Sequence, residues 1–192
     1  MRNISHWTPR YIANRVAVGI YEKQHPNHPW ITHSAISLLS TYLKKSDVGL
    51  EWGSGRSTVW FASQLKQLVS VEDNHKWYQK VNEKLEHLNL KNTEYILATD
   101  RESYTGAADK FQENSLYFVV VDGSYRSDCA IKAVSKIKNV GIIVLDNANW
   151  FLPSNSHSPN SKNYQTSSIS DDWQHFLHLV KDWRILWTSN GV

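Results

Sequence analysis

The sequence predicts a doubly wound α/β domain with a mostly parallel sheet, and three observations lead to this fold class. Short apolar runs typical of strands alternate along the chain with longer amphipathic segments of helical period. The run at 116–122, LYFVVVD, is apolar almost without a break, which is typical of a strand buried on both faces. Strands that alternate with helices at this spacing form a parallel sheet covered by helices on both sides.

Each element is predicted from its own stretch of sequence. A helix over 30–45 precedes the sheet, and strands are predicted at 47–52, 67–72, 93–99, 116–122, 141–146 and 183–188. Between them, helices are predicted at 57–65, 74–90, 129–137 and 171–180. The helix over 74–90, for example, places Trp77, Val81, Leu85 and Leu88 at helical spacing.

The 192 residues are enough for one domain with a sizeable core, so we expect a single domain over 1–192. Its first part, 1–45, is predicted to be a helical segment. The stretch 149–170 is polar and rich in Ser and Asn, and it is too long for an ordinary connection. We therefore interpret 149–170 as a lid or a mobile loop.

The end of the sequence leaves two alternatives open. A sheet of this kind normally closes with an antiparallel hairpin, but the strand at 183–188 is followed only by a Ser-Asn-Gly turn. Either the last antiparallel strand is missing from the sequence, or the sheet has been trimmed. An edge left open in this way can pair with another chain, which predicts a homodimer.

Composition excludes several classes of protein. Lys and Arg total 21 and Asp and Glu total 18, and the formal net charge of +3 is scattered, so nucleic-acid binding is not indicated. No stretch resembles a signal peptide or a membrane span. The single cysteine, Cys129, excludes an internal disulfide and a cysteine zinc cluster. We expect a cytoplasmic protein.

The stretch LEWGSGRST at 50–58 carries the first candidate site. Glu51 ends a strand, Gly53 and Gly55 allow a tight turn and close approach of a ligand, and Ser57 and Thr58 can cap the next helix. A dinucleotide fingerprint needs a third glycine where Thr58 stands, and a phosphate-binding loop needs a Gly-Lys pair that is absent. S-adenosylmethionine has no phosphate but carries an ammonium and a sulfonium, so an acid beside the turn fits that cofactor.

A second acid, Glu72, ends the next strand, where a carboxylate can accept both hydroxyls of a ribose. NAD would use the same acid, so Glu72 indicates an adenosine ligand without choosing between cofactors. Glu51 and the missing third glycine favour S-adenosylmethionine. A nicotinamide-dependent oxidoreductase stays as the alternative enzyme class.

Four blocks, LEWGSGRSTVWFA, LVSVEDNHKWY, YFVVVDGSYRSDCAIKAV and GIIVLDNANW, resemble class I S-adenosylmethionine-dependent methyltransferases. The resemblance covers roughly residues 29–150 and implies a Rossmann-like methyltransferase fold with S-adenosylmethionine as cofactor. It assigns the cofactor's methionine part, ribose and adenine to separate groups of residues, and it suggests that two further residues close over the cofactor. In that order these are Glu51, Gly53, Ser54, Gly55 and Ser57 for the methionine; Glu72 for the ribose; Asp73, Thr99 and Asp100 for the adenine; and Trp30 and Thr32 for the closure.

A second acidic group follows the fourth and fifth strands. Asp122, Asp146 and Asn147 offer three oxygen ligands, a set that suits Mg²⁺ or Ca²⁺. The pattern is similar to catechol-type O-methyltransferases, where the matching acid and Asp-Asn pair hold a divalent cation. Those enzymes usually carry a lysine where this chain has Tyr125, with Arg126 next. In the alternative interpretation Asp122 contacts cofactor or substrate, Asp146 caps a strand end, and Asn147 is a turn residue.

The predicted activity is methyl transfer to an oxygen or nitrogen of a small molecule or glycan. Asp122 is the first candidate for base or orienter of the acceptor, with His33 and His157 behind it. Arg56 and Arg126 either bind an anionic substrate group, or they are solvated or pair with nearby acids. Outside enzymes, the chain would be a catalytically inactive methyltransferase-like fold that only binds a partner.

Overall fold

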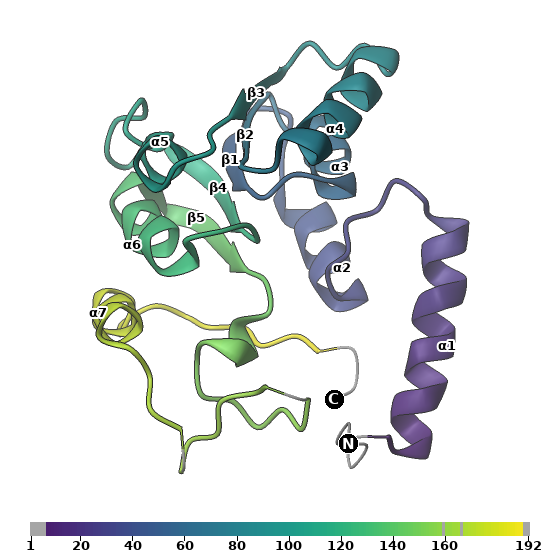
Figure 1. The fold of residues 1–192 in the computed structure, drawn as a ribbon, viewed down its shortest axis with the longest axis vertical. Helices are drawn as coiled ribbons and strands as arrows, with labels where there is room; N and C mark the ends of the chain where they lie inside the picture. The colour runs from purple at the N-terminus through teal and green to yellow at the C-terminus, as the bar shows by residue number, and fades with distance from the viewer. Residues whose placement is uncertain (1–6, 159, 166, 190–192) are drawn as a thin grey trace.

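The computed structural model describes residues 7–158, 160–165 and 167–189, which form a five-stranded sheet with helices on both faces (Figure 1). The strand order is β3-β2-β1-β4-β5, and every neighbouring pair is parallel. The doubly wound α/β prediction is therefore confirmed. The strands are β1 (Val48–Trp52), β2 (Gln67–Glu72), β3 (Thr93–Leu97), β4 (Leu116–Val121) and β5 (Ile137–Leu145).

The helices lie where the sequence predicts helical segments, with one addition. The predicted helices correspond to α2, α3, α4, α6 and α7, while the short α5 between β3 and β4 is absent from the sequence prediction. A long helix, α1, supplies the predicted N-terminal helical segment and stands apart from the sheet (Figure 1). Their bounds are α1 (Pro9–Gln24), α2 (His33–Tyr42), α3 (Arg56–Gln64), α4 (His75–His87), α5 (Arg101–Gly106), α6 (Arg126–Lys136) and α7 (Asp171–Leu179).

Two apolar layers hold the helices to the sheet. On one face, Trp52 packs with Tyr104 of α5 and Cys129 of α6, all fully buried. On the other face, Phe61 of α3 and Phe118 of β4 lie in one cluster with residues of α2. Burial of both faces explains why β1, β2 and β4 read as almost continuous apolar runs.

The strand order creates a switch point between β1 and β4. The chain leaves β1 toward β2 and β3, then crosses back so that β4 pairs with the other side of β1. Just past these strands Gly53, at φ +92°, lies so close to the next turn that a Cβ would be 2.5 Å from the Gly123 nitrogen. Ligands of open α/β sheets bind above strand ends at such a point.

The predicted sixth strand at 183–188 is wrong, since this stretch forms no strand in the described part of the chain. It pairs with neither edge strand, and without a partner its apolar side chains have no buried face. Ile185 and Leu186 are accordingly 57% and 72% exposed. The outer edge of β5 has no partner strand among the described residues, and the homodimer stays a prediction.

The stretch 149–170 is irregular apart from the short 3-10 helix η1 (Ala148–Trp150) and one bridge between Pro153 and Lys162. Its beginning is anchored, because Phe151 stacks on Trp173 of α7 with ring centroids 5.3 Å apart. The lid interpretation of this stretch stays a prediction. In the described part of the chain, no helix combines the length and apolarity needed to cross a bilayer.

Candidate active site

The glycine bend joins β1 to α3 and presents its backbone at the switch point. Gly55 is the N-cap of α3, and its N–H donates to Thr58 Oγ1 at 2.9 Å. The helix therefore begins at Arg56, one residue before the predicted start at Ser57, and Thr58 satisfies the helix start from inside its first turn. Gly53 needs to be glycine for two reasons, its positive φ and the contact with Gly123.

Glu51 lies fully buried beneath this bend. Its Oε2 accepts hydrogen bonds from Thr58 Oγ1 and Ser70 Oγ, both at 2.7 Å. Its Oε1 is equally buried and has no hydrogen-bond partner among the described residues. Burial raises the pKa of Glu51 to about 7, against the opposing effect of the surrounding hydroxyl donors. An unpartnered buried oxygen is costly, and a bound donor would satisfy it.

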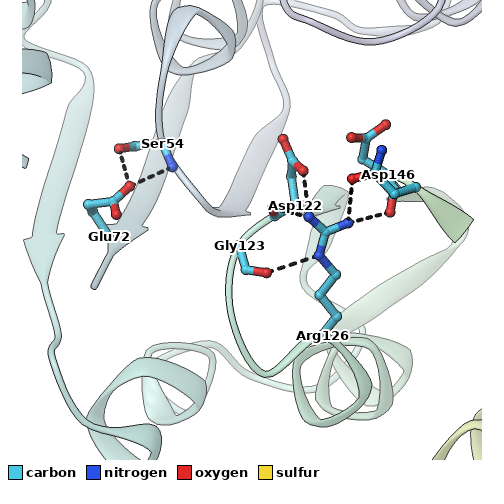
Figure 2. Close-up of polar contacts among 7 residues, drawn as sticks. Ser54, Glu72, Asp122, Gly123, Arg126 and Asp146 are labelled. Carbon is cyan, nitrogen blue, oxygen red and sulfur yellow. Dashed lines mark hydrogen bonds and ion pairs between the residues drawn. The ribbon is translucent and has the colours of Figure 1, made fainter. Parts of the chain in front are cut away.

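Glu72, at the tip of β2, is bonded to the bend itself (Figure 2). Its Oε2 accepts from the Ser54 backbone N–H at 3.1 Å and from the Ser54 hydroxyl at 2.6 Å, while Oε1 accepts from the Asn74 N–H at 3.0 Å. The residue is only 6% exposed. A carboxylate has about four acceptor positions, so these bonds leave one on Oε1. The predicted grip of Glu72 on a ribose stays a prediction.

These two acids have no cationic partner in the described part of the chain, where neither Glu51 nor Glu72 forms an ion pair. The nearest candidate by sequence, Arg56, places its guanidinium over the Trp30 ring, 4.8 Å from the centroid. The β1–β2 edge therefore holds two buried acids whose hydrogen bonds come from neutral hydroxyl and N–H donors.

Four residues of this network are missing from the predicted site. Trp77 Nε1 donates to the Ser54 carbonyl at 2.7 Å, and the Tyr95 hydroxyl lies 2.6 Å from Ser54 Oγ. The helical spacing of Trp77 indicates an apolar face, so its polar contact could not be predicted from that spacing. Ser70 offers a usable signal, because it is a lone hydroxyl in an apolar strand two residues before Glu72, on the same face. Thr58, the fourth, is predicted only to cap the helix.

The remaining predicted cofactor residues are spread around this edge. Trp30 reaches the bend through Arg56, whereas Thr32 caps α2 and its hydroxyl donates to Thr188 at 2.7 Å. Asp100 caps α5 by accepting from the Ser103 N–H at 2.9 Å. Of the others, Asp73 follows β2, Thr99 follows β3 and is exposed, and Ser57 lies in the first turn of α3. Their contacts with a cofactor stay a prediction.

The β4–β5 edge is organised around Arg126 rather than around open carboxylates (Figure 2). Arg126 Nη2 donates to Asp122 Oδ1 at 2.9 Å, and Nε donates to the Gly123 carbonyl at 2.9 Å. Nη1 donates to the Asp146 carbonyl and to Asn147 Oδ1, the latter at 3.3 Å. Three residues predicted as metal ligands thus surround a guanidinium.

Asp122 keeps access to solvent, with its side chain 37% exposed. Partial burial and the negative charge of Asp146 raise the pKa of Asp122 above the ordinary carboxyl value, and Arg126 opposes that rise. His33, by contrast, packs edge-on against Tyr21 with centroids 4.7 Å apart, and His157 is exposed in the 149–170 stretch. Asp122 is the carboxyl group that borders the switch point on the β4 side.

Asp122 Oδ1 and Asn147 Oδ1 do not fit a divalent cation in this arrangement. Both already accept hydrogen bonds from a positively charged group, which would repel a second cation. Among the described residues, no three His, Cys, Asp or Glu side chains lie close enough together to hold a metal ion. Asn147, at φ +50°, is a turn residue, as the alternative interpretation expects, while the contact of Asp122 with cofactor or substrate stays a prediction.

Comparison with solved structures gives the fold that the sequence resemblance predicts. Precorrin 8w decarboxylase of Methanobacterium thermoautotrophicum is 16% identical, with a TM-score of 0.52 over 82% of this chain and 75% of its own. An rRNA methylase of Streptococcus thermophilus is 14% identical, with a TM-score of 0.50 over 62% and 72%. A methyltransferase-like protein of Silicibacter pomeroyi is 23% identical, with a TM-score of 0.49 over 62% and 73%.

The first two similarities, with TM-scores of 0.52 and 0.50, confirm the Rossmann-like fold. No protein-family model matches the chain, and no curated protein is similar to it in sequence.

Proposed function

We propose that the protein transfers a methyl group from S-adenosylmethionine to an oxygen or nitrogen of a small molecule or glycan. The observation that carries this proposal is the pair of buried acids, Glu51 and Glu72, which form no ion pair with any described residue. A fold shared with an rRNA methylase supports the reaction class. It does not bear on the acceptor.

The charge of this edge matches the proposed cofactor. S-adenosylmethionine brings an ammonium and a sulfonium, and Glu51 Oε1 is the buried oxygen that needs a donor. The Gly53 turn supplies backbone free of side chains, which allows close approach. A dinucleotide would instead bring two phosphate charges toward Glu51 and Glu72, whose contacts include no cation to offset them. The nicotinamide alternative is therefore the weaker candidate.

In this reaction the residues of the chain have two roles, which are to align the acceptor and to accept its proton. When bound, S-adenosylmethionine supplies an electrophilic methyl group, so alignment of the acceptor provides much of the rate. Asp122, on the β4 side of the switch point, accepts the proton that a hydroxyl or amine acceptor loses as it takes up the methyl group. Arg126 fixes Oδ1 of that carboxylate at 2.9 Å and so orients the base.

Calorimetry with S-adenosylhomocysteine and, separately, NADH tests the proposal. We expect saturable binding of S-adenosylhomocysteine by the wild type, and a loss of roughly tenfold or more in Glu72→Gln, because a charge-assisted bond is removed. Glu94→Gln is the matched control, since Glu94 is an exposed acid of the same sheet that pairs with Lys110 on the surface. Binding of NADH instead, or equal affinity in wild type and Glu72→Gln, would refute the proposal.

A further inference from the structure

We propose that Arg126 is a permanent internal cation at the acceptor side, taking the place that a divalent cation holds in catechol-type enzymes, so that the reaction needs no divalent cation. That this edge serves the methyl acceptor rests on the proposed function. The position of the Arg126 guanidinium among the oxygens of this edge is independent of the proposed function. The inference adds a positioning residue and narrows the class of acceptor.

The hydrogen bonds of Arg126 leave it no spare donor. A guanidinium has five N–H groups. Nε donates to the Gly123 carbonyl; Nη2 donates to the Asp122 carbonyl at 2.6 Å and to Asp122 Oδ1 at 2.9 Å; and Nη1 donates to the Asp146 carbonyl and to Asn147 Oδ1. Five acceptors therefore use all five N–H groups. An anionic substrate group would have to displace one of them, so the geometry favours the interpretation in which Arg126 pairs with nearby acids.

Burial fixes this arrangement in place. The Arg126 side chain is only 14% exposed, and its guanidinium carbon lies 5.5 Å from the centroid of the Phe151 ring. The acceptors come from the ends of β4 and β5 and from the turns that follow them. One side chain at the start of α6 thus links both strand ends, the role that a shared metal ion would otherwise have.

A divalent cation shared by these side chains would lie next to the guanidinium. It would compete for Asp122 Oδ1 and Asn147 Oδ1 while lying beside a fixed positive charge, in a partly buried place where that repulsion is poorly screened. Without a divalent cation at this site, two adjacent hydroxyls of an acceptor would have no metal ion to chelate. The acceptor class that fits is therefore a single hydroxyl or amine that approaches Asp122, rather than a chelating diol.

Titration with Mn²⁺, followed by the loss of its free electron paramagnetic resonance signal, tests the inference without cofactor or acceptor. We expect no saturable Mn²⁺ binding by the wild type. Arg126→Ala frees the oxygen set and should bind one Mn²⁺ at least tenfold more tightly than the wild type, and Asp146→Asn in that background should abolish the gain. Arg15→Ala removes the same charge from an exposed position of α1 and should behave like the wild type.

Two results would overturn the inference. One is saturable Mn²⁺ binding by the wild type that Asp146→Asn removes, which would show that a metal and Arg126 share the site. The other is absence of binding in both Arg126→Ala and Arg126→Gln, each verified as folded by circular dichroism, which would show that these oxygens do not form a cation site. S-adenosylhomocysteine binding, measured on the same wild-type sample, reports separately on the proposed function.

Discussion

The two halves of the sheet's carboxyl edge carry similar acids, but different kinds of hydrogen-bond donor surround them. At the β1–β2 half, Glu51 and Glu72 accept from hydroxyl and backbone N–H groups. At the β4–β5 half, Asp122 accepts from Arg126, whose side chain is nearly buried. Both halves are built from strand ends that meet at one switch point.

This difference indicates what each half can bind. Neutral donors supply hydrogen bonds but no positive charge, so the β1–β2 half favours a cationic ligand, which would also stabilise the ionised form of Glu51. At the β4–β5 half, the Arg126 guanidinium already compensates the negative charge of Asp122, so this half does not need a cationic ligand. In the proposed function, one side of this sheet edge binds a cationic cofactor and the other side orients an uncharged acceptor.

The largest effect on stability is expected from removing the internal cation. Arg126→Ala should lower the free energy of unfolding by about 3 kcal/mol, because Asp122 and the other acceptors lose their donors in a partly buried place. Adding Asp122→Asn should restore about 1–2 kcal/mol of this loss. Urea denaturation of the two single variants and the double variant measures the coupling. Strict additivity would contradict an internal ion pair.

An effect of similar size is expected from a change of pH, which acts on the β1–β2 half of the edge. Native Glu51 keeps its proton up to a pH of about 7, whereas in the unfolded chain it loses the proton near the ordinary glutamate pKa of 4.5. Between these values the native state binds more protons, so the free energy of unfolding should fall as pH rises, in total by about 3 kcal/mol.

Thermal denaturation across this pH range measures the slope, with Glu51→Gln as the comparison. The variant cannot titrate at this position and should have a flatter profile than the wild type. Equal slopes for the two proteins would show that Glu51 is not the buried titrating group.

Ser54→Ala distinguishes two roles of the Ser54 hydroxyl, a bond to Glu72 and a direct contact with the cofactor. Loss of the hydroxyl removes the 2.6 Å bonds to Glu72 and Tyr95, which should cost about 1 kcal/mol of stability. Because Glu72 Oε2 is then less occupied, S-adenosylhomocysteine should bind equally well or a few-fold more tightly in calorimetry. Tenfold weaker binding would mean that Ser54 itself contacts the cofactor, as the sequence resemblance implies.

The smallest effect is expected from a surface arginine with good geometry. Arg101 pairs with Asp128 at 2.8 Å, but its side chain is 64% exposed. Arg101→Ala should leave the urea midpoint unchanged, because water screens such pairs. A shift as large as that of Arg126→Ala would remove the distinction between an internal and a surface cation.

Sequence patterns predict the parallel sheet and the location of the glycine bend, because apolar period and glycine placement are local properties. They fail at 183–188, where an apolar run has strand character but no partner edge to pair with. They also fail to place Arg126, since its five acceptors come from residues up to 21 positions away and meet only through the strand order. The hydrogen bonds from Ser54 to Glu72 could not be predicted for the same reason. The spacing places both residues at the edge without showing that they bond.

Proton release on cofactor binding tests the central claim most directly. A cationic ligand beside Glu51 should lower its pKa from about 7, so that binding near pH 6 releases a proton. Titration of S-adenosylmethionine, which carries the sulfonium, at about pH 6 in buffers of different ionisation enthalpy should therefore show release of about 0.5–1 proton in the wild type and none in Glu51→Gln. Binding without proton release, or no binding at all, would contradict a cationic ligand held by uncompensated acids.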